Sequence, residues 1–161
     1  MAGAIFLMLD GIKGEATDEA HKEEINVLSY SWGMNNPTAV HSGAGTAAGK
    51  VSVNDLVVTK SMDKASPALT EHCCLGKVVP KGTLTVQRAG EDKVQALVLE
   101  LENIFVTAVD GGDASDMPSL PTETVTLSFK KFEYKYTPQD KEGKGEAEIT
   151  VGFNIEENVK V

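Results

Sequence analysis

Residues 122–136 read Thr-Glu-Thr-Val-Thr-Leu-Ser-Phe-Lys-Lys-Phe-Glu-Tyr-Lys-Tyr, and apolar and polar side chains alternate along them. Such alternation is typical of a strand with one face on a core and the other on water or a partner. The apolar positions run 125, 127 and 129, then change phase to 132, 134 and 136. This one-residue change at Lys130-Lys131 predicts a β-bulge that bends the strand.

Similar patterns elsewhere predict a protein built mainly from sheet. Further strands are predicted at 4–9, 24–33, 50–60, 82–88, 94–109 and 147–156. Residues 94–109 also fit a helical stripe, but the alternating leucines at 97, 99 and 101 and the β-rich 104–106 favour a strand. The bulky side chains expected on the core faces of 24–33 and 147–156 are Leu28, Tyr30, Trp32, Ile149, Val151, Phe153 and Ile155.

One short helix is predicted at about 66–75. Ser66 is a good N-cap, Pro67 fits the first turn, and Gly76 suits the position after the last turn. Leu69, Cys73 and Leu75 would line its buried side. Loops are expected at 13–22, 34–49 and 110–121, which leaves about eight strands and one helix in a single domain spanning 1–161. This mainly β pattern suits a barrel or a sandwich.

Charge and cysteine usage exclude several classes of protein. The chain has 15 basic and 24 acidic residues, a net charge of −9 and one arginine, Arg88. Nucleic acid and anionic membranes are therefore not expected partners. Cys73 and Cys74 are adjacent and cannot form a disulfide framework, which favours synthesis in a reducing cytoplasm. The N-terminus reads as a strand, so export without an N-terminal signal peptide is expected.

Motifs that would carry catalysis or bind a metal are weak. Residues 45–51 resemble a phosphate-binding loop but are one residue short of it, with Val51 where a hydroxyl is needed. His72, Cys73 and Cys74 point in different directions on a helix, and no second cluster completes a metal site. Ser29 and Ser31 have no histidine at a recognisable spacing. No enzymatic activity, cofactor or metal is expected.

Several ordered segments together resemble one family. They are residues 10–15 (Asp-Gly-Ile-Lys-Gly-Glu), 25–33 (Ile-Asn-Val-Leu-Ser-Tyr-Ser-Trp-Gly), 44–51, 64–67 (Lys-Ala-Ser-Pro), 121–124 (Pro-Thr-Glu-Thr) and 136–140 (Tyr-Thr-Pro-Gln-Asp). Over essentially its full length the chain resembles the haemolysin-coregulated protein family, the inner-tube subunits of bacterial type VI secretion systems. The resemblance implies a compact β-barrel flanked by one helix, assembled into hexameric rings that stack into a tube.

The resemblance also implies partners and a location. The expected partners are further copies of the chain, a spike protein, a contractile sheath and effector proteins in the lumen. The subunit would be cytoplasmic before firing and then secreted to the exterior or into a target cell. Two other readings stay open from the residues alone: a monomeric ligand-binding β-barrel, which needs an apolar cavity, and a secreted hydrolase, which needs a convergent catalytic site.

The candidate contact residues fall into two groups. The small side chains of Ser29, Ser31 and Gly33 share one face of a strand and are expected to line the lumen and contact effectors. The glycine-rich loop and charged residues near the helix are expected to make ring-stacking or subunit contacts: Thr38, His41, Gly43, Gly45, Gly49, Lys60, Lys64, Asp113 and Asp116. Because a hexamer of subunits at −9 is strongly anionic, weak and salt-sensitive stacking is expected.

Overall fold

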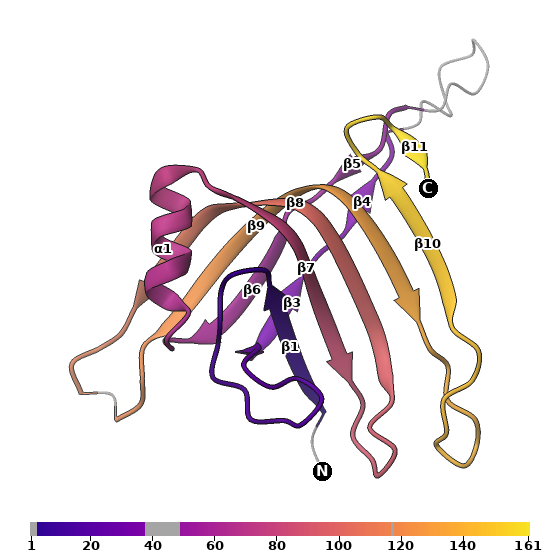
Figure 1. Ribbon diagram of the computed structural model, residues 1–161, viewed down its shortest axis with the longest axis horizontal. Helices are drawn as coiled ribbons and strands as arrows, with labels where there is room; N and C mark the ends of the chain where they lie inside the picture. Colours follow the sequence, from indigo (N-terminus) through magenta and orange to yellow (C-terminus); the bar gives the residue numbers. More distant parts are fainter. Residues whose placement is uncertain (1–2, 38–48, 117) are drawn as a thin grey trace.

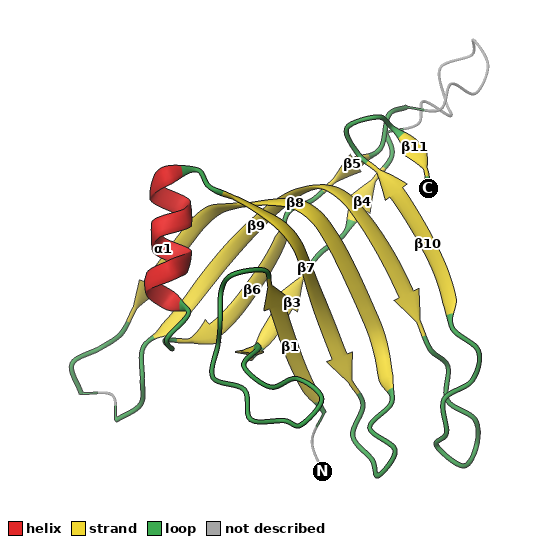
Figure 2. Cartoon of the chain, viewed as in Figure 1, coloured by secondary structure: helices red, strands yellow, loops and turns green. Residues whose placement is uncertain are grey.

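The computed structural model describes residues 3–37, 49–116 and 118–161 of the chain. The expected helix is α1, Ser66–Leu75, and the remaining regular structure is sheet (Figures 1 and 2). The strands are β1 (Ala4–Leu9), β2 (Ile25–Val27), β3 (Ser29–Ser31), β4 (Met34–Asn35), β5 (Ser52–Val53), β6 (Leu56–Ser61), β7 (Val78–Gln87), β8 (Gln95–Gly112), β9 (Thr122–Tyr136), β10 (Ile149–Asn154) and β11 (Val159–Lys160). The ambiguous segment 94–109 is thus a strand, as predicted.

The strands form one strongly curved antiparallel sheet and a small separate pair. The main order is β11-β10-β9-β8-β7-β1-β2, and β6 joins β9 to β3. The long strands β8 and β9 arch over the whole molecule, so that β9 pairs with β10 through its second half and with β6 through its first half (Figure 1). The pair β4–β5 forms a two-stranded arm outside this sheet.

The expected compact barrel is not closed by hydrogen bonds. The predicted strand 24–33 is broken at Leu28, so that β2 pairs with β1 whereas β3 pairs with β6. Among the described residues no ladder joins β2 to β6. The two edges of the sheet meet at Leu28, whose backbone N–H donates to the Thr59 carbonyl oxygen of β6 at 2.7 Å. The fold is therefore mainly β with one short helix, as expected, but the sheet curls around its core without closing.

The phase change predicted in residues 122–136 is present, but it is not a bulge of β9. Phe129 and Phe132 are both buried on either side of Lys130-Lys131. The facing strand β8 changes phase at the same place, where Asn103 has φ 54°, so the pairing register is the same before and after this point. The register shift between these strands instead lies between Val106 and Ala108. Both strands thus bend together, which helps to explain how the ribbon arches.

The core lies inside the curve of the sheet and under α1. Its fully buried members come from β1, β2, β6, β7, β8, β9 and α1, and include Ile25, Leu56, Val58, Leu69, Val79, Leu84, Leu99, Ile104, Val125 and Leu127. Burying each such side chain stabilises the fold by roughly 1.5–3 kcal/mol.

The predicted core faces of two strands are confirmed for some residues and wrong for others. In the first, Ile25 and Val27 are buried, whereas Leu28 and Tyr30 are 62% and 38% exposed, because the break at Leu28 moves the strand from β1 to β6. Trp32 does pack against the core, as predicted. In β10, which lies near the end of the sheet, Ile149 and Val151 are 63% and 49% exposed because the rest of the subunit does not cover this face. Phe153 and Ile155 are partly buried against the core, as predicted.

The helix has the predicted bounds and a different N-cap. Ala65 occupies the N-cap position, and the Ser66 hydroxyl instead accepts the backbone N–H of Asp63 at 3.0 Å. Gly76 ends the helix in the left-handed conformation, φ 62°, as predicted. Leu69 is buried and Cys73 packs against the core, but Leu75 is 63% exposed, contrary to expectation, because it lies past the last turn that faces the sheet.

Candidate assembly surfaces

The predicted lumen residues lie on a larger polar face. Ser29 and Ser31 are exposed on β3 and pair with Thr59 and Val57 of β6. Across β6, Thr59 and Val57 pair with Thr124 and Thr126 of β9. Paired residues in antiparallel strands share a face of the sheet. We call the surface of Ser29, Ser31, Val57, Thr59, Thr124 and Thr126 the hydroxyl face. Val57 is its one apolar member, and the opposite side of β6 and β9 is core.

The threonines of this face were not among the predicted site residues. A signal for them existed, because Thr124 and Thr126 occupy the polar positions in the alternating stretch 122–136. Gly33, the third predicted lumen residue, lies beyond the end of β3 and is half-buried. A Cβ built there would come no closer than 3.8 Å to another residue, on Asn54 Nδ2, so packing alone does not require a glycine.

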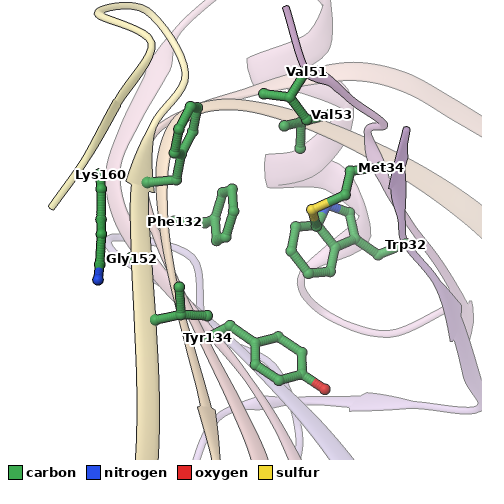
Figure 3. Close-up of a pocket in the computed structure, with 10 residues that line it drawn as sticks. Trp32, Met34, Val51, Val53, Phe132, Tyr134, Gly152 and Lys160 are labelled. Carbon is green, nitrogen blue, oxygen red and sulfur yellow. The ribbon is translucent and has the colours of Figure 1, made fainter. Parts of the chain in front are cut away.

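An apolar groove of about 470 Å³ lies between the β4–β5 arm and the β10–β11 hairpin (Figure 3). In the figure Trp32 and Met34 form one wall, with Phe132 and Tyr134 opposite and Val51 and Val53 at the end. The complete lining is Trp32, Met34, Val51, Val53, Phe132, Tyr134, Val151, Gly152, Phe153 and Lys160. We call it the Trp32 groove. The groove exists because the predicted strand 50–60 is interrupted at Asn54-Asp55. The first part, β5, pairs with β4 away from the main sheet.

Aromatic rings form the floor of the Trp32 groove. The Trp32 ring lies 5.0 Å from that of Phe132 in an edge-to-face arrangement and 6.2 Å from that of Tyr134. The buried indole Nε1 of Trp32 has no hydrogen-bond partner within the described part of the chain. Nearby, partial burial raises the pKa of the Tyr30 phenol, with a smaller contribution from Tyr134, so Tyr30 stays neutral at physiological pH.

Lys60 does not form the exposed cation that the sequence predicted. Its side chain is fully buried, and Nζ donates hydrogen bonds to Glu123 at 2.8 Å and Ser66 Oγ at 3.2 Å and forms an ion pair with Asp63 at 2.9 Å. We call these four residues the Lys60 cluster. The ammonium group is thereby neutralised and hydrogen-bonded inside the subunit. Lys60 and Glu123 point inward because they continue the inward positions of β6 and β9, so Lys60 cannot contact another ring.

The structure describes only some of the other residues that were predicted to make ring-stacking or subunit contacts. Thr38, His41, Gly43 and Gly45 lie outside the described residues. Gly49 is half-buried, and a Cβ there would lie 2.6 Å from the Pro37 carbonyl oxygen, so the close approach requires glycine. Lys64, Asp113 and Asp116 are exposed, which suits contact with another molecule.

A catalytic or metal centre is not visible in the residues 3–37, 49–116 and 118–161. No group of three His, Cys, Asp or Glu side chains within these ranges is arranged to hold a metal ion. Cys73 and Cys74 are free thiols, half-buried and exposed respectively. No described helix has the length and hydropathy needed to cross a bilayer.

Known proteins share both the sequence and the fold. The family model "Type VI secretion system effector, Hcp" matches residues 6–136. Protein hcp1 of Pseudomonas aeruginosa is 40% identical over 162 residues, covering 99% of each chain. A solved type six secretion system protein superposes with a TM-score of 0.95 at 31% identity, covering 99% of this chain and 100% of that one. Hcp1 from Salmonella typhimurium gives 0.82 at 34% identity over the full length of both chains.

These matches identify the chain as a structural subunit of a secretion system, not an enzyme. The chain belongs to the haemolysin-coregulated protein (Hcp) family of type VI secretion systems. Its function is that of a secreted structural subunit that forms rings and the secretion tube. The Trp32 groove is the apolar cavity that a monomeric ligand-binding barrel would need, but family membership decides against that alternative.

Proposed function

We propose that the hydroxyl face of β3, β6 and β9 lines the lumen of the ring and contacts the effector proteins that the tube carries. The observation that supports this is the row of hydroxyl side chains that runs across three paired strands, from Ser29 through Thr59 to Thr124. In the adjacent row Ser31 and Thr126 lie on either side of Val57. Hydroxyl groups stay hydrated and can donate or accept hydrogen bonds with many partners. They lack both the charge and the apolar area that would bind one cargo tightly, so this surface suits the passage of different effectors.

Ser31→Trp tests this proposal. Because Ser31 is exposed, the subunit should fold and form rings of about six times 17.1 kDa. The indole would occupy space that the cargo needs, so we expect effector recovered with the tagged ring to fall about tenfold, equivalent to roughly 1.4 kcal/mol. Ser119→Trp, in an exposed loop, is the matched control and should leave recovery unchanged. Equal recovery with Ser31→Trp and wild type would contradict the proposal.

We also propose that stacking between rings uses Lys64 against Asp113 and Asp116 of the next ring. All three side chains are exposed, and the net charge of −9 per subunit makes stacking depend on such local pairs. We expect the stacked fraction to change between about 50 mM and 500 mM salt, because the screening length shortens severalfold over this range. Lys64→Glu should lower that fraction, as sedimentation velocity would show. Stacking indifferent to both changes would point to apolar or main-chain contacts instead.

The spike protein, the contractile sheath and effectors are proposed partners on the strength of family membership. We propose that the subunit is cytoplasmic before firing and leaves through the contractile apparatus. Secretion that stops when the sheath is deleted, with the cytoplasmic amount of subunit unchanged, is the expected result. Continued secretion without the sheath would contradict this route.

A further inference from the structure

The Lys60 cluster places an amine and two carboxyl groups together inside the subunit. Lys60 and Glu123 are directly paired across β6 and β9, and the chain after β6 brings Asp63 against them. Figure 1 shows the end of β6 beside the first turn of α1, where this happens. The Lys60 side chain is fully buried, and those of Asp63 and Glu123 are 9% and 6% exposed. Val58 and Val125, the next inward residues of the two strands, are fully buried as well.

This environment favours a neutral product over the buried ion pair. Burial of an ammonium group and a carboxylate costs free energy that their mutual attraction returns only in part. Condensation of Lys60 with Glu123 replaces these two charges by one amide, which is less costly to bury. Nζ and Oε2 are already 2.8 Å apart, and Cδ of Glu123 is bonded to that oxygen. Well-oriented groups within one molecule react with effective concentrations of about 10⁵–10⁸ M.

The other two members of the cluster supply the proton transfers that an amide needs. The Asp63 carboxylate lies 2.9 Å from Lys60 Nζ, so it is placed to accept a proton from the ammonium group. The Ser66 hydroxyl donates to Glu123 Oε2 at 2.8 Å and polarises the carboxyl group that is attacked. A pocket of about 540 Å³, lined in part by Asp63, Ser66 and Glu123, gives a small leaving molecule a way out.

We propose that Lys60 and Glu123 condense into an intramolecular isopeptide bond, for which the ion pair is the reactant state. Asp63 accepts one proton from the Lys60 ammonium group, and the free amine attacks Cδ of Glu123 to form the N–C bond. A second proton leaves the nitrogen, and both protons pass to Oε2. The Cδ–Oε2 bond then breaks and one water molecule departs. Asp63 ends as a carboxylate, as it began, so the step requires no oxidant, reductant or other reagent.

The bond lies directly behind the hydroxyl face. Thr59 and Thr124, the next paired residues of β6 and β9, belong to that face. An amide between Lys60 and Glu123 closes a covalent loop through the two strands, which restricts the unfolded chain as a disulfide does. It also prevents these strands from separating at this point when force acts on the subunit. The bond forms within one chain, so the inference does not depend on what the hydroxyl face contacts.

Mass spectrometry of the purified chain under denaturing conditions tests the proposal directly. Denaturation separates an ion pair but leaves an amide intact, so the expected mass is that of the sequence less one water molecule. Trypsin should release residues 51–64 joined to residues 94–130, with no cleavage after Lys60. The same digest holds a control, because Lys77 and Glu71 form an exposed ion pair at 3.1 Å and should remain unlinked.

Two variants separate the roles of the residues. Lys60→Arg keeps a buried cation but has no amine to acylate, so its mass should be that of its own sequence. Asp63→Asn keeps both reacting groups and removes the proton acceptor. The rate at which the link appears after refolding should then fall about 10²–10⁴-fold. Stability is not the readout, since loss of either the ion pair or the amide would lower it.

Three results would overturn the inference. An unmodified wild-type mass, with trypsin cleaving after Lys60, would show that the amine stays free. This measurement needs no variant, so it decides the question even if a substituted chain does not fold. A link from Lys60 to Asp63 would show that Glu123 is not the acyl group. Linking of Asp63→Asn at the wild-type rate would contradict the role of Asp63 in proton transfer.

Discussion

Replacement of Lys60 by alanine is expected to lower the free energy of unfolding by about 3–5 kcal/mol. The Lys60 ammonium is fully buried and lies 2.9 Å from Asp63 and 2.8 Å from Glu123. Without it, two neighbouring buried carboxylates face each other with no cation between them. The Ser66 hydroxyl would then be the one remaining donor of the Lys60 cluster, and it donates to Glu123 at 2.8 Å. Urea unfolding followed by Trp32 fluorescence measures the loss.

Lys77→Ala is the matched control for this prediction. Lys77 also forms an ion pair, with Glu71 at 3.1 Å, but both side chains are about half exposed. Removal of an exposed pair should cost no more than about 1 kcal/mol. All variants must be compared at one protein concentration, since assembly adds to apparent stability. A loss below about 1 kcal/mol for Lys60→Ala would mean that water reaches the cluster and solvates the carboxylates.

The parts of the fold that were predicted correctly depend on local signals. The helix 66–75 was predicted from Pro67 near its start and Gly76 after its end, which act within a few residues. The burial of residues 125, 127 and 129 and the phase change after them also follow from periodicity along one strand. These features need no knowledge of what the strand pairs with.

The errors occur where burial depends on distant pairing or on a second copy. Leu28 and Tyr30 are bulky and alternate with small residues, so periodicity placed them in the core. They are exposed because the strand switches partner at Leu28, a tertiary event with no signature in that segment. Alternation of apolar residues predicts that one face of a strand is covered. It does not indicate whether the same subunit or a neighbouring copy covers that face. Ile149 and Val151 on β10 illustrate the same ambiguity.

The Lys60 cluster shows the opposite error. The sequence carried a signal for burial, but the charge of the lysine side chain led to a prediction at the surface. Lys60 follows Leu56 and Val58 with period two, and Glu123 precedes Val125 and Leu127 in the same way. Alternation along each strand would by itself have placed both charged residues on the core face, but the prediction placed Lys60 on the surface. Lysine is almost never buried unless it is paired, so the lysine was expected on the surface. Lys60 and Glu123 carry opposite charges at inward positions of two strands, and this indicates that the two side chains pair with each other.

Phe132→Ala is expected to cost about 3–5 kcal/mol of unfolding free energy. Phe132 is 5% exposed and contacts the rings of Trp32, Phe129 and Phe153, with centroids 5.0, 6.4 and 6.3 Å away. Its removal opens a cavity below the Trp32 groove that the surrounding strands cannot close, because β9 is held between β8 and β10. Loss of the ring also removes the edge-to-face contact on Trp32, so the native fluorescence should change as well.

Tyr136→Ala is the control on the same strand, since Tyr136 is 39% exposed and its removal leaves no buried cavity. We expect it to cost about 1 kcal/mol or less, as is usual for surface positions. Similar losses for the two variants would contradict the assignment of Phe132 to the core. Phe132→Leu separates stability from assembly, because it keeps most of the buried volume and should cost less than the alanine. If this variant folds stably but forms fewer rings, the aromatic floor of the Trp32 groove contributes to ring assembly beyond its contribution to the core.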